Sequence, residues 1–235
     1  MQGIKGILFD KDGTLVDFEA TWFAIGDLMA LKAADGDRSR ADALMDAAGY
    51  DFAMGGFRAD SVFAAGTNAD IVTLWYPDAD EAARAAMVKH FDEVTAEQGA
   101  AKAVALPGSR DALAHLHGAG FRLGVATNDS TIGAEKTLLT LGVAEMFDAA
   151  YGYDSVPNPK PAPDSIHAFS KLTGLKPSEI AMVGDNRHDL EMARAGGALA
   201  IAVLSGTGTR ESLTPMADVV LESIADLPAF LAGGA

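Results

Sequence analysis

Apolar and polar positions alternate regularly over the C-terminal half of the chain. After Pro107, short apolar runs rich in Val, Ile, Leu and Ala are separated by longer segments whose apolar residues recur every three or four positions. Strands are predicted at 121–127, 148–151, 179–183, 198–204 and 218–221, and helices at 109–118, 131–141, 163–173, 187–195 and 224–232. Strands that alternate with helices indicate a parallel, doubly wound sheet with helices on both faces. We therefore predict a Rossmann-like α/β fold.

The N-terminal part of the chain has a different pattern. Residues 4–9 form one apolar run, which predicts a further buried strand, but from Phe18 to about Gly99 the residues Ala, Leu and Met recur at helical spacing. Helices separated by glycines and by one proline are predicted at 18–34, 38–48, 60–65, 68–75 and 79–98. This block lies between two strands of the predicted sheet, so it cannot belong to the sheet itself.

We therefore predict an α/β core domain of residues 1–16 and 101–235, with an inserted all-α domain of residues 17–100. Small residues near Asp17 and at 99–103 are candidate hinges between the two domains.

Composition and charge narrow the class of protein. Hydrophobic residues make up 49% of the 235 residues, which is typical of a globular chain. The formal net charge of -15 disfavours nucleic acid and anionic membranes as partners. The sequence has no cysteine, which excludes disulfides and thiolate zinc sites. It has no signal-peptide pattern and no run of 18 apolar residues, so we expect a soluble, cytoplasmic protein, either a monomer or a homodimer.

Polar residues gather where the predicted strands end. Carboxylates follow the first strand and the strand at 179–183, a hydroxyl and an amide follow the strand at 121–127, and a lysine lies in the proline-rich loop 152–163. These residues are Asp10, Asp12, Thr127, Asn128, Lys160, Asp185 and Asp189. Ligands of open parallel sheets bind at the carboxyl ends of the strands, so we expect these side chains to form one site.

Taken singly, several of these residues have ordinary structural interpretations. The Asp-Gly pair after the first strand could form a surface turn, Thr127 could begin a helix cap, and Lys160 could be a solvated loop residue. A calcium-binding loop is excluded, because the EF-hand spacing counted from Asp10 places Leu15 and Thr21 where Gly and Glu are required. The shared position at the strand ends favours a functional site.

The residues also form four motifs that resemble those of the haloacid-dehalogenase-like hydrolase superfamily. They are Asp10-Lys-Asp-Gly-Thr14, Thr127 at the end of a strand, Lys160-Pro-Ala-Pro163 and Gly184-Asp185-Asn-Arg-His-Asp189. The resemblance spans the whole chain, since the helical insert is similar to the family's first type of cap domain. Within the superfamily, the chain is most similar to phosphoglycolate-phosphatase-like enzymes.

The resemblance implies a role for each carboxylate. Asp10 would attack phosphorus and form an aspartyl-phosphate, and Asp12 would protonate the leaving alkoxide and then deprotonate the hydrolytic water. Mg²⁺ would be held by Asp10, Asp185 and the backbone carbonyl of Asp12. Asp189 would hold metal-bound waters or the ammonium group of Lys160.

The resemblance also implies how the phosphoryl group is bound. Lys160 would be a point charge on the nucleophile and on the phosphoryl oxygens. The Thr127 hydroxyl, Asn128 and nearby backbone N–H groups would bind the remaining oxygens. The predicted function is a magnesium-dependent phosphatase that acts on a small phosphorylated metabolite, and phosphoglycolate is the preferred candidate. Because Asp12 is present, phosphoester hydrolysis is favoured over dehalogenation.

Two other classes of function stay open. A sugar-phosphate mutase uses the same pair of aspartates, and a non-catalytic binding protein could retain the fold. Lys11 departs from the apolar residue that many relatives carry, and strand alternation predicts that its side chain points away from both carboxylates. Arg58 follows a glycine-rich break in the insert and is a candidate for contact with substrate. The segment Ser205-Gly-Thr-Gly-Thr209 is interpreted as a turn, and His188 as a solvated residue.

Overall fold

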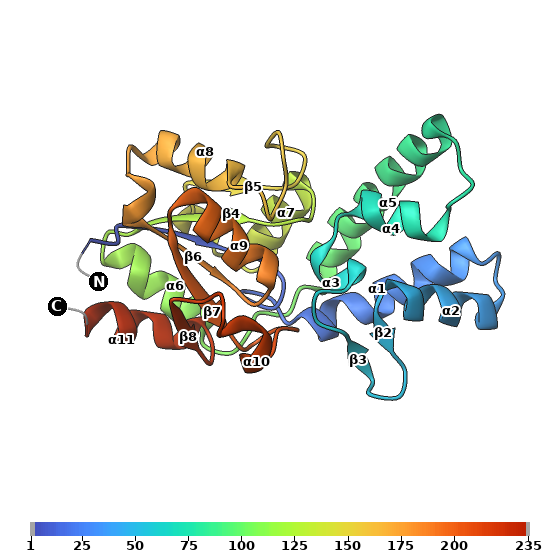
Figure 1. The fold of residues 1–235 in the computed structure, drawn as a ribbon, viewed down its shortest axis with the longest axis horizontal. Helices are drawn as coiled ribbons and strands as arrows, with labels where there is room; N and C mark the ends of the chain where they lie inside the picture. The colour runs from blue at the N-terminus through green and yellow to red at the C-terminus, as the bar shows by residue number, and fades with distance from the viewer. Residues whose placement is uncertain (1–2, 234–235) are drawn as a thin grey trace.

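A six-stranded parallel sheet lies at the centre of one half of the molecule in the computed structural model, which describes residues 3–233 (Figure 1). From edge to edge its strands are β5 (Ala149–Tyr151), β4 (Arg122–Ala126), β1 (Gly6–Phe9), β6 (Ile180–Gly184), β7 (Leu199–Val203) and β8 (Val219–Leu221). All neighbouring strands are parallel, and Phe9 of β1 lies between Val125 of β4 and Val183 of β6. The predicted doubly wound α/β fold is confirmed.

Helices cover both faces of this sheet. They are α6 (Ser109–Gly118), α7 (Thr131–Thr140), α8 (Asp164–Thr173), α9 (Arg187–Gly196), α10 (Arg210–Leu213) and α11 (Leu227–Ala232), with 3₁₀ turns at Ala144–Met146, Pro177–Glu179 and Ile224–Asp226. Phe9 shares a hydrophobic core with α6, α7 and α11, while Leu8 shares a second core with α8, α9 and α10. A parallel sheet buried on both faces needs apolar residues at successive positions, which explains the unbroken apolar run in β1.

The inserted segment forms the other half of the molecule and has a hydrophobic core of its own (Figure 1). Its elements are α1 (Phe18–Ala33), α2 (Arg38–Ala48), β2 (Tyr50–Asp51), β3 (Gly56–Phe57), α3 (Val62–Ala65), α4 (Asn68–Trp75) and α5 (Glu81–Lys102). We call residues 17–100 the cap from here on. The helices agree with the sequence prediction, whereas the antiparallel hairpin of β2 and β3 departs from an all-α cap. Strands of two residues leave no alternating pattern that a sequence could reveal.

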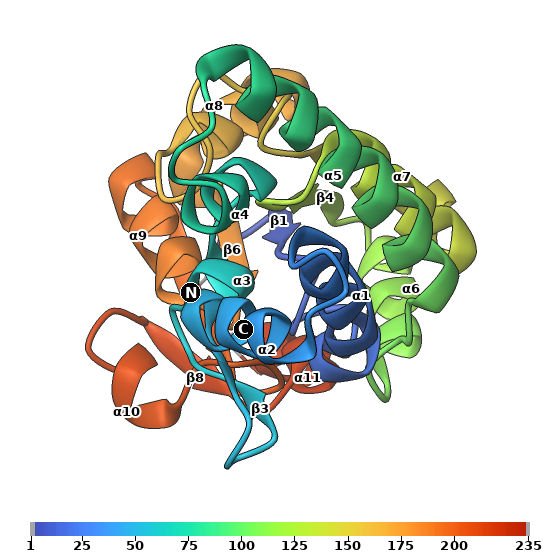
Figure 2. The same cartoon turned by 90° about the vertical axis from the view of Figure 1, so that its right-hand side faces the viewer.

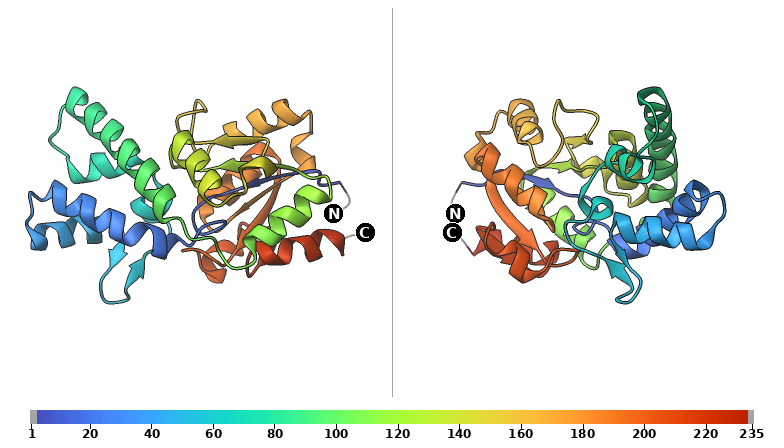
Figure 3. Two further views of the ribbon diagram at one scale, coloured as in Figure 1. Left: turned by 180° about the vertical axis from the view of Figure 1, so that it is seen from behind. Right: turned by 45° about the vertical axis from the view of Figure 1, so that its right-hand side comes forward.

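Two chain crossings join the cap to the core, one before α1 and one after α5 (Figure 3). Helix α5 also packs along α7 of the core (Figure 2). The candidate hinge at 99–103 is wrong for most of its length, because α5 continues to Lys102. Gly99 instead lies where α5 passes α1, and a Cβ atom there would come within 3.0 Å of the Trp22 ring. The domain boundaries at 17 and 100 stay a prediction. Within residues 3–233, no helix combines the length and apolar character needed to cross a bilayer.

Candidate active site

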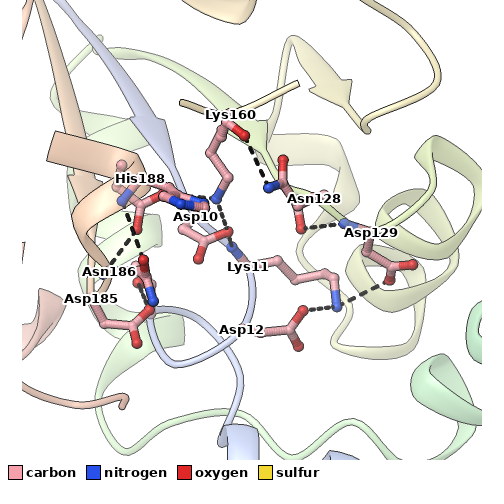
Figure 4. A network of polar contacts seen from close by, with 12 residues as sticks. Asp10, Lys11, Asp12, Asn128, Asp129, Lys160, Asp185, Asn186 and His188 are labelled. Atoms are coloured by element: carbon pink, nitrogen blue, oxygen red, sulfur yellow. Dashed lines mark hydrogen bonds and ion pairs between the residues drawn. The ribbon is translucent and has the colours of Figure 1, made fainter. Parts of the chain in front are cut away.

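The side chains predicted from the strand ends converge at the carboxyl edge of the three central strands (Figure 4). Asp10 and Asp12 follow β1, Thr127 follows β4, and Asp185 follows β6. Because β1 pairs with both β4 and β6, these strand ends are neighbours. Lys160 reaches the same place from the loop before α8.

Lys160 links two carboxylates in the interior. Its Nζ atom donates to Asp10 Oδ1 and to Asp189 Oδ1, both at 2.7 Å. Lys160 is 8% exposed and Asp189 is fully buried. Burial alone would lower the pKa of Lys160, but Asp10 and Asp189 outweigh it and raise that pKa. The lysine is therefore a permanent ammonium group. Its contact with Asp189 matches one of the two roles predicted for Asp189, which was to hold the ammonium group of Lys160.

Asp10, Asp185 and Asp189 form a buried acidic cluster. Each offers a carboxylate oxygen, and these oxygens lie within 4.8 Å of one another. Burial raises the pKa of Asp10 to about 7, although Lys160 opposes the shift. Burial, followed by the charges of Asp10 and Asp189, also raises the pKa of Asp185. Three carboxylates with one ammonium leave excess negative charge in a dry site, and the oxygen donors match a hard divalent cation.

The turn at 205–209 supports Asp185 from behind. The backbone N–H of Thr207 donates to Asp185 Oδ2 at 2.9 Å, and the Thr14 hydroxyl lies 3.4 Å from Oδ1. A Cβ atom on Gly206 would approach Asp185 Oδ2 to 2.0 Å, and one on Gly13, where φ is +76°, would come within 2.6 Å of the same carboxylate. Both glycines are thus required for the close approach of backbone to Asp185. The sequence interpretation of a turn missed this supporting role, although its position directly after β7 is a usable signal.

Lys11 contradicts the prediction that it points away from the carboxylates. Its Nζ atom lies 2.5 Å from Asp12 Oδ2 and 3.3 Å from Asp129 Oδ2, and 5.0 Å from the centre of the Trp22 ring. The prediction assumed strand alternation, but β1 ends at Phe9 and the chain turns immediately afterwards. Burial would lower the pKa of Lys11, yet Asp12 and Asp129 raise it.

Asp12 is held from both sides. Lys11 occupies its Oδ2 atom, and the indole N–H of Trp22, from the cap, donates to its Oδ1 atom at 2.6 Å. The sequence analysis did not identify Asp129 or Trp22. Burial raises the pKa of Asp129, which lies in the same cavity as Asp12. The three residues Asp12, Lys11 and Asp129 therefore form a second charged cluster beside the first.

Thr127 and Asn128 directly follow β4, as predicted from the sequence, and the two residues have different hydrogen-bond partners. The Thr127 hydroxyl oxygen accepts the backbone N–H of Asp129 at 3.1 Å, so its proton stays free to donate. The Asn128 amide donates to the Ala65 carbonyl of the cap at 2.8 Å and to the Lys160 carbonyl at 3.2 Å. Its amide nitrogen thus joins cap to core, while its buried Oδ1 has no hydrogen-bond partner within the described residues.

A cavity that opens to solvent lies between core and cap. The core contributes Asp10, Asp12, Thr127, Asn128, Asp129, Lys160, Asn186 and His188, and the cap contributes Phe18, Trp22, Met29, Phe63, Ala64, Ala65, Gly66, Thr67, Asn68, Ile71 and Thr95.

Two other sequence expectations differ from the structure. Arg58 does not line this cavity but lies 3.0 Å from Asp46 on α2, with 43% of its side chain exposed. In this structure Arg58 is paired outside the cavity, and the contact with substrate expected of it stays a prediction. His188 is not simply solvated, because its Nδ1 atom lies 3.2 Å from the Ala65 carbonyl and it lines the cavity.

Comparison with known proteins places this geometry in context. A family model described as haloacid dehalogenase-like hydrolase matches residues 4–197. Phosphoglycolate phosphatase of Salmonella typhimurium is 30% identical over 97% of this chain and 92% of its own length, and that of Escherichia coli O157:H7 is 29% identical over 96% and 92%.

Solved structures share the fold. A protein described as a predicted phosphoglycolate phosphatase from Haemophilus somnus superposes with a TM-score of 0.76 at 23% identity, over 98% of this chain and 99% of that one. CbbY from Rhodobacter sphaeroides, solved with xylulose-(1,5)bisphosphate, superposes with a TM-score of 0.69 at 24% identity, over 95% and 96%.

Proposed function

The chain belongs to the haloacid dehalogenase-like hydrolase family and is a phosphatase of that family, and on this premise we propose a magnesium-dependent phosphomonoesterase that works through an aspartyl-phosphate. One observation carries the proposal. Asp10 accepts a hydrogen bond from the Lys160 ammonium and belongs to the buried acidic cluster with Asp185 and Asp189, and Asp12 lies on the same loop. A carboxylate attacks a phosphate dianion only where cations offset the repulsion. Lys160 is one such cation, and the acidic cluster would hold a second.

The residues fit a division of labour in the first half of the reaction. An Asp10 oxygen attacks phosphorus while the bond from phosphorus to the leaving alcohol breaks, and Asp12 gives a proton to the departing oxygen. Lys160 and the Thr127 hydroxyl bind phosphoryl oxygens as charge shifts onto them. Asp10, Asp185 and the carbonyl of Asp12 would hold Mg²⁺, which supplies positive charge to the phosphoryl oxygens.

The second half reverses the proton transfer. Asp12 takes a proton from water, whose oxygen attacks the phosphorus of the aspartyl-phosphate, and the bond from phosphorus to Asp10 breaks. Inorganic phosphate then leaves and Asp10 is restored. Trp22 and Lys11 each donate a hydrogen bond to Asp12, and together they fix the orientation of its carboxyl group.

The substrate is proposed as a small phosphomonoester. Phosphoglycolate is the candidate from the sequence, and its name appears in the curated relatives at about 30% identity. It is therefore the reference substrate for any assay of this protein.

The proposal is tested by phosphate release from phosphoglycolate and p-nitrophenyl phosphate, with Mg²⁺ and with EDTA, for the wild-type protein and for Asp10→Asn. We expect metal-dependent turnover that Asp10→Asn abolishes, and an acid-stable phosphoryl adduct on Asp10 after rapid quenching. Full activity in Asp10→Asn would overturn the mechanism. Transfer of the phosphoryl group to a second position of a sugar phosphate, without release of phosphate, would indicate the mutase instead.

A further inference from the structure

The cap side of the cavity is built from uncharged side chains. Every cap residue that lines it, within residues 3–233, is apolar, a glycine, a threonine or an asparagine. Rings and aliphatic groups of Phe18, Trp22, Met29, Phe63 and Ile71 form most of this wall. The wall lies opposite the core residues that bind the phosphoryl group, so it faces the organic part of a bound phosphoester.

Several polar groups of this wall already have partners. Asn68 Nδ2 donates to Asp92 Oδ1 at 2.8 Å and to Thr95 Oγ1 at 2.9 Å. The N-terminus of α4 would attract an anion, but Asp70 already supplies one, because its Oδ2 atom accepts the Thr67 backbone N–H at 2.8 Å and the Thr67 hydroxyl at 2.7 Å. Asp70 thus takes up part of the donor capacity of this helix end, and within residues 3–233 no cationic side chain of the cap lines the cavity.

The core side next to this wall is acidic. Asp12 and Asp129 both line the cavity, while the Lys11 ammonium that pairs with them is 2% exposed and lies behind them. A carboxylate on the leaving group would therefore lose its contact with water. It would face aromatic rings and the side of the cavity that already carries the carboxylates of Asp12 and Asp129. Burial of an unpaired charge in such surroundings is strongly unfavourable.

We infer that this enzyme selects phosphomonoesters whose leaving group is an uncharged alcohol and discriminates against leaving groups that carry a carboxylate. The inference rests on the proposed phosphatase function and concerns its selectivity alone. It separates this chain from its curated relatives, since the leaving group of phosphoglycolate carries a carboxylate. Arg58, the cation that could have met such a group from the cap, is paired with Asp46 outside the cavity.

Two matched pairs of substrates test the inference on the wild-type protein. In each pair a hydroxymethyl group replaces a carboxylate: 2-hydroxyethyl phosphate against phosphoglycolate, and glycerol 3-phosphate against 3-phosphoglycerate. The assay is run at pH 8, because a histidine side chain with an ordinary pKa is neutral there. We expect kcat/KM to be about tenfold or more higher for the uncharged member of each pair.

Equal values, or a higher value for the carboxylate in either pair, would overturn the inference. Turnover of p-nitrophenyl phosphate alone, with neither pair accepted, would also count against it but would leave the proposed phosphatase standing. The absence of all turnover with Mg²⁺ would remove the proposed function itself.

A charge placed in the wall gives a second test. Met29→Lys adds an ammonium group on a side chain of similar length, and Met29→Gln is the uncharged control. We expect Met29→Lys to raise the ratio of kcat/KM for phosphoglycolate to that for 2-hydroxyethyl phosphate about tenfold, and Met29→Gln to leave it unchanged. An unchanged ratio in a folded Met29→Lys protein would contradict the inference, and the wild-type comparison does not depend on either variant.

Discussion

At the scale of single residues, Lys160 is proposed to act in catalysis, and its ammonium group contacts Asp10 and Asp189 in the interior. Lys160→Ala removes the positive charge that offsets the attack of one anion on another. We expect kcat to fall by about 100-fold, equivalent to about 3 kcal/mol of barrier, in a phosphate-release assay. Lys171→Ala, an exposed lysine on α8, is the control and should keep wild-type kcat. Near-normal turnover in Lys160→Ala would exclude Lys160 from the site.

Lys11 has a structural role in addition to its contact with Asp12, the proposed proton carrier. Lys11→Met leaves the carboxylates of Asp12 and Asp129 in buried surroundings without their cation. We expect the free energy of unfolding, measured by urea denaturation, to fall by about 3 kcal/mol.

The double variant Lys11→Met with Asp129→Asn removes one of the two stranded charges and is the matched comparison. Its loss of stability should be smaller than that of Lys11→Met alone. The effects of two substitutions fail to add in this way when the two residues are in contact, and they add when the residues are distant. Strictly additive losses would show that Lys11 and Asp129 do not interact.

At this scale the sequence predicted the residues whose position follows from the sheet. Asp10, Thr127 and Asp185 come directly after buried strands, so the order of strands brings them together. Lys11, Trp22 and Asp129 form contacts that depend on how a loop turns and how the cap sits on the core. Neither property has a periodic signal in the sequence, which is why the predicted orientation of the Lys11 side chain was wrong.

At the level of elements, α1 and α5 cross closely where the helical Gly99 faces the ring of Trp22. Gly99→Val places a branched side chain within reach of the indole ring, which also donates to Asp12. We expect a loss of about 2 kcal/mol in the free energy of unfolding and a lower kcat, because the ring must move and its hydrogen bond to Asp12 weakens.

Gly118→Ala is the control for Gly99→Val. Gly118 is also helical, but nothing lies within 4 Å of the Cβ position there. Its replacement should leave kcat unchanged and raise stability slightly through helix propensity. If Gly99→Val behaved like Gly118→Ala, the crossing of α1 and α5 would not be a close contact in solution.

Most of the elements that the sequence predicted have a repeating apolar pattern, and each observed boundary lies within a few residues of the predicted one. The short elements β5, β8 and α3 were predicted as well. The hairpin of β2 and β3 and the four-residue helix α10 are too short for a pattern to repeat. The predicted end of α5 was early because Gly99 resembles a helix breaker, whereas tertiary contact with Trp22 keeps it helical.

At the level of the whole molecule, four side-chain polar contacts among the described residues tie the cap to the core around the cavity. Trp22 donates to Asp12, Asn128 donates to the Ala65 carbonyl, and the Tyr153 hydroxyl donates to Asp92 Oδ2 at 2.6 Å. His188 Nδ1 lies 3.2 Å from the same Ala65 carbonyl. Each joins an element near the phosphoryl site to an element of the uncharged wall. Closure of the cap and orientation of Asp12 are therefore linked through the same residues.

The acidic cluster makes stability depend on pH and on metal together. The pKa of Asp10 is raised to about 7 and that of Asp185 is raised, while carboxyl groups of an unfolded chain ionise near pH 4. Between about pH 4 and 7 the folded protein therefore binds more protons than the unfolded chain, so its stability without metal decreases as the pH rises through this window.

A divalent cation binds the ionised carboxylates and competes with these protons, so its stabilising effect has the opposite dependence. We expect the increase in Tm caused by a fixed concentration of Mg²⁺ to be small at pH 5 and much larger at pH 8, with affinity falling up to about tenfold per pH unit below 7 for each proton displaced. Differential scanning fluorimetry with Mg²⁺ and with EDTA measures this increase, and subtraction at each pH removes the titration of all other groups. In Asp10→Asn the increase should be smaller and depend less on pH. An increase of the same size at pH 5 and pH 8 in the wild-type protein would show that the cation does not bind at Asp10 and Asp185.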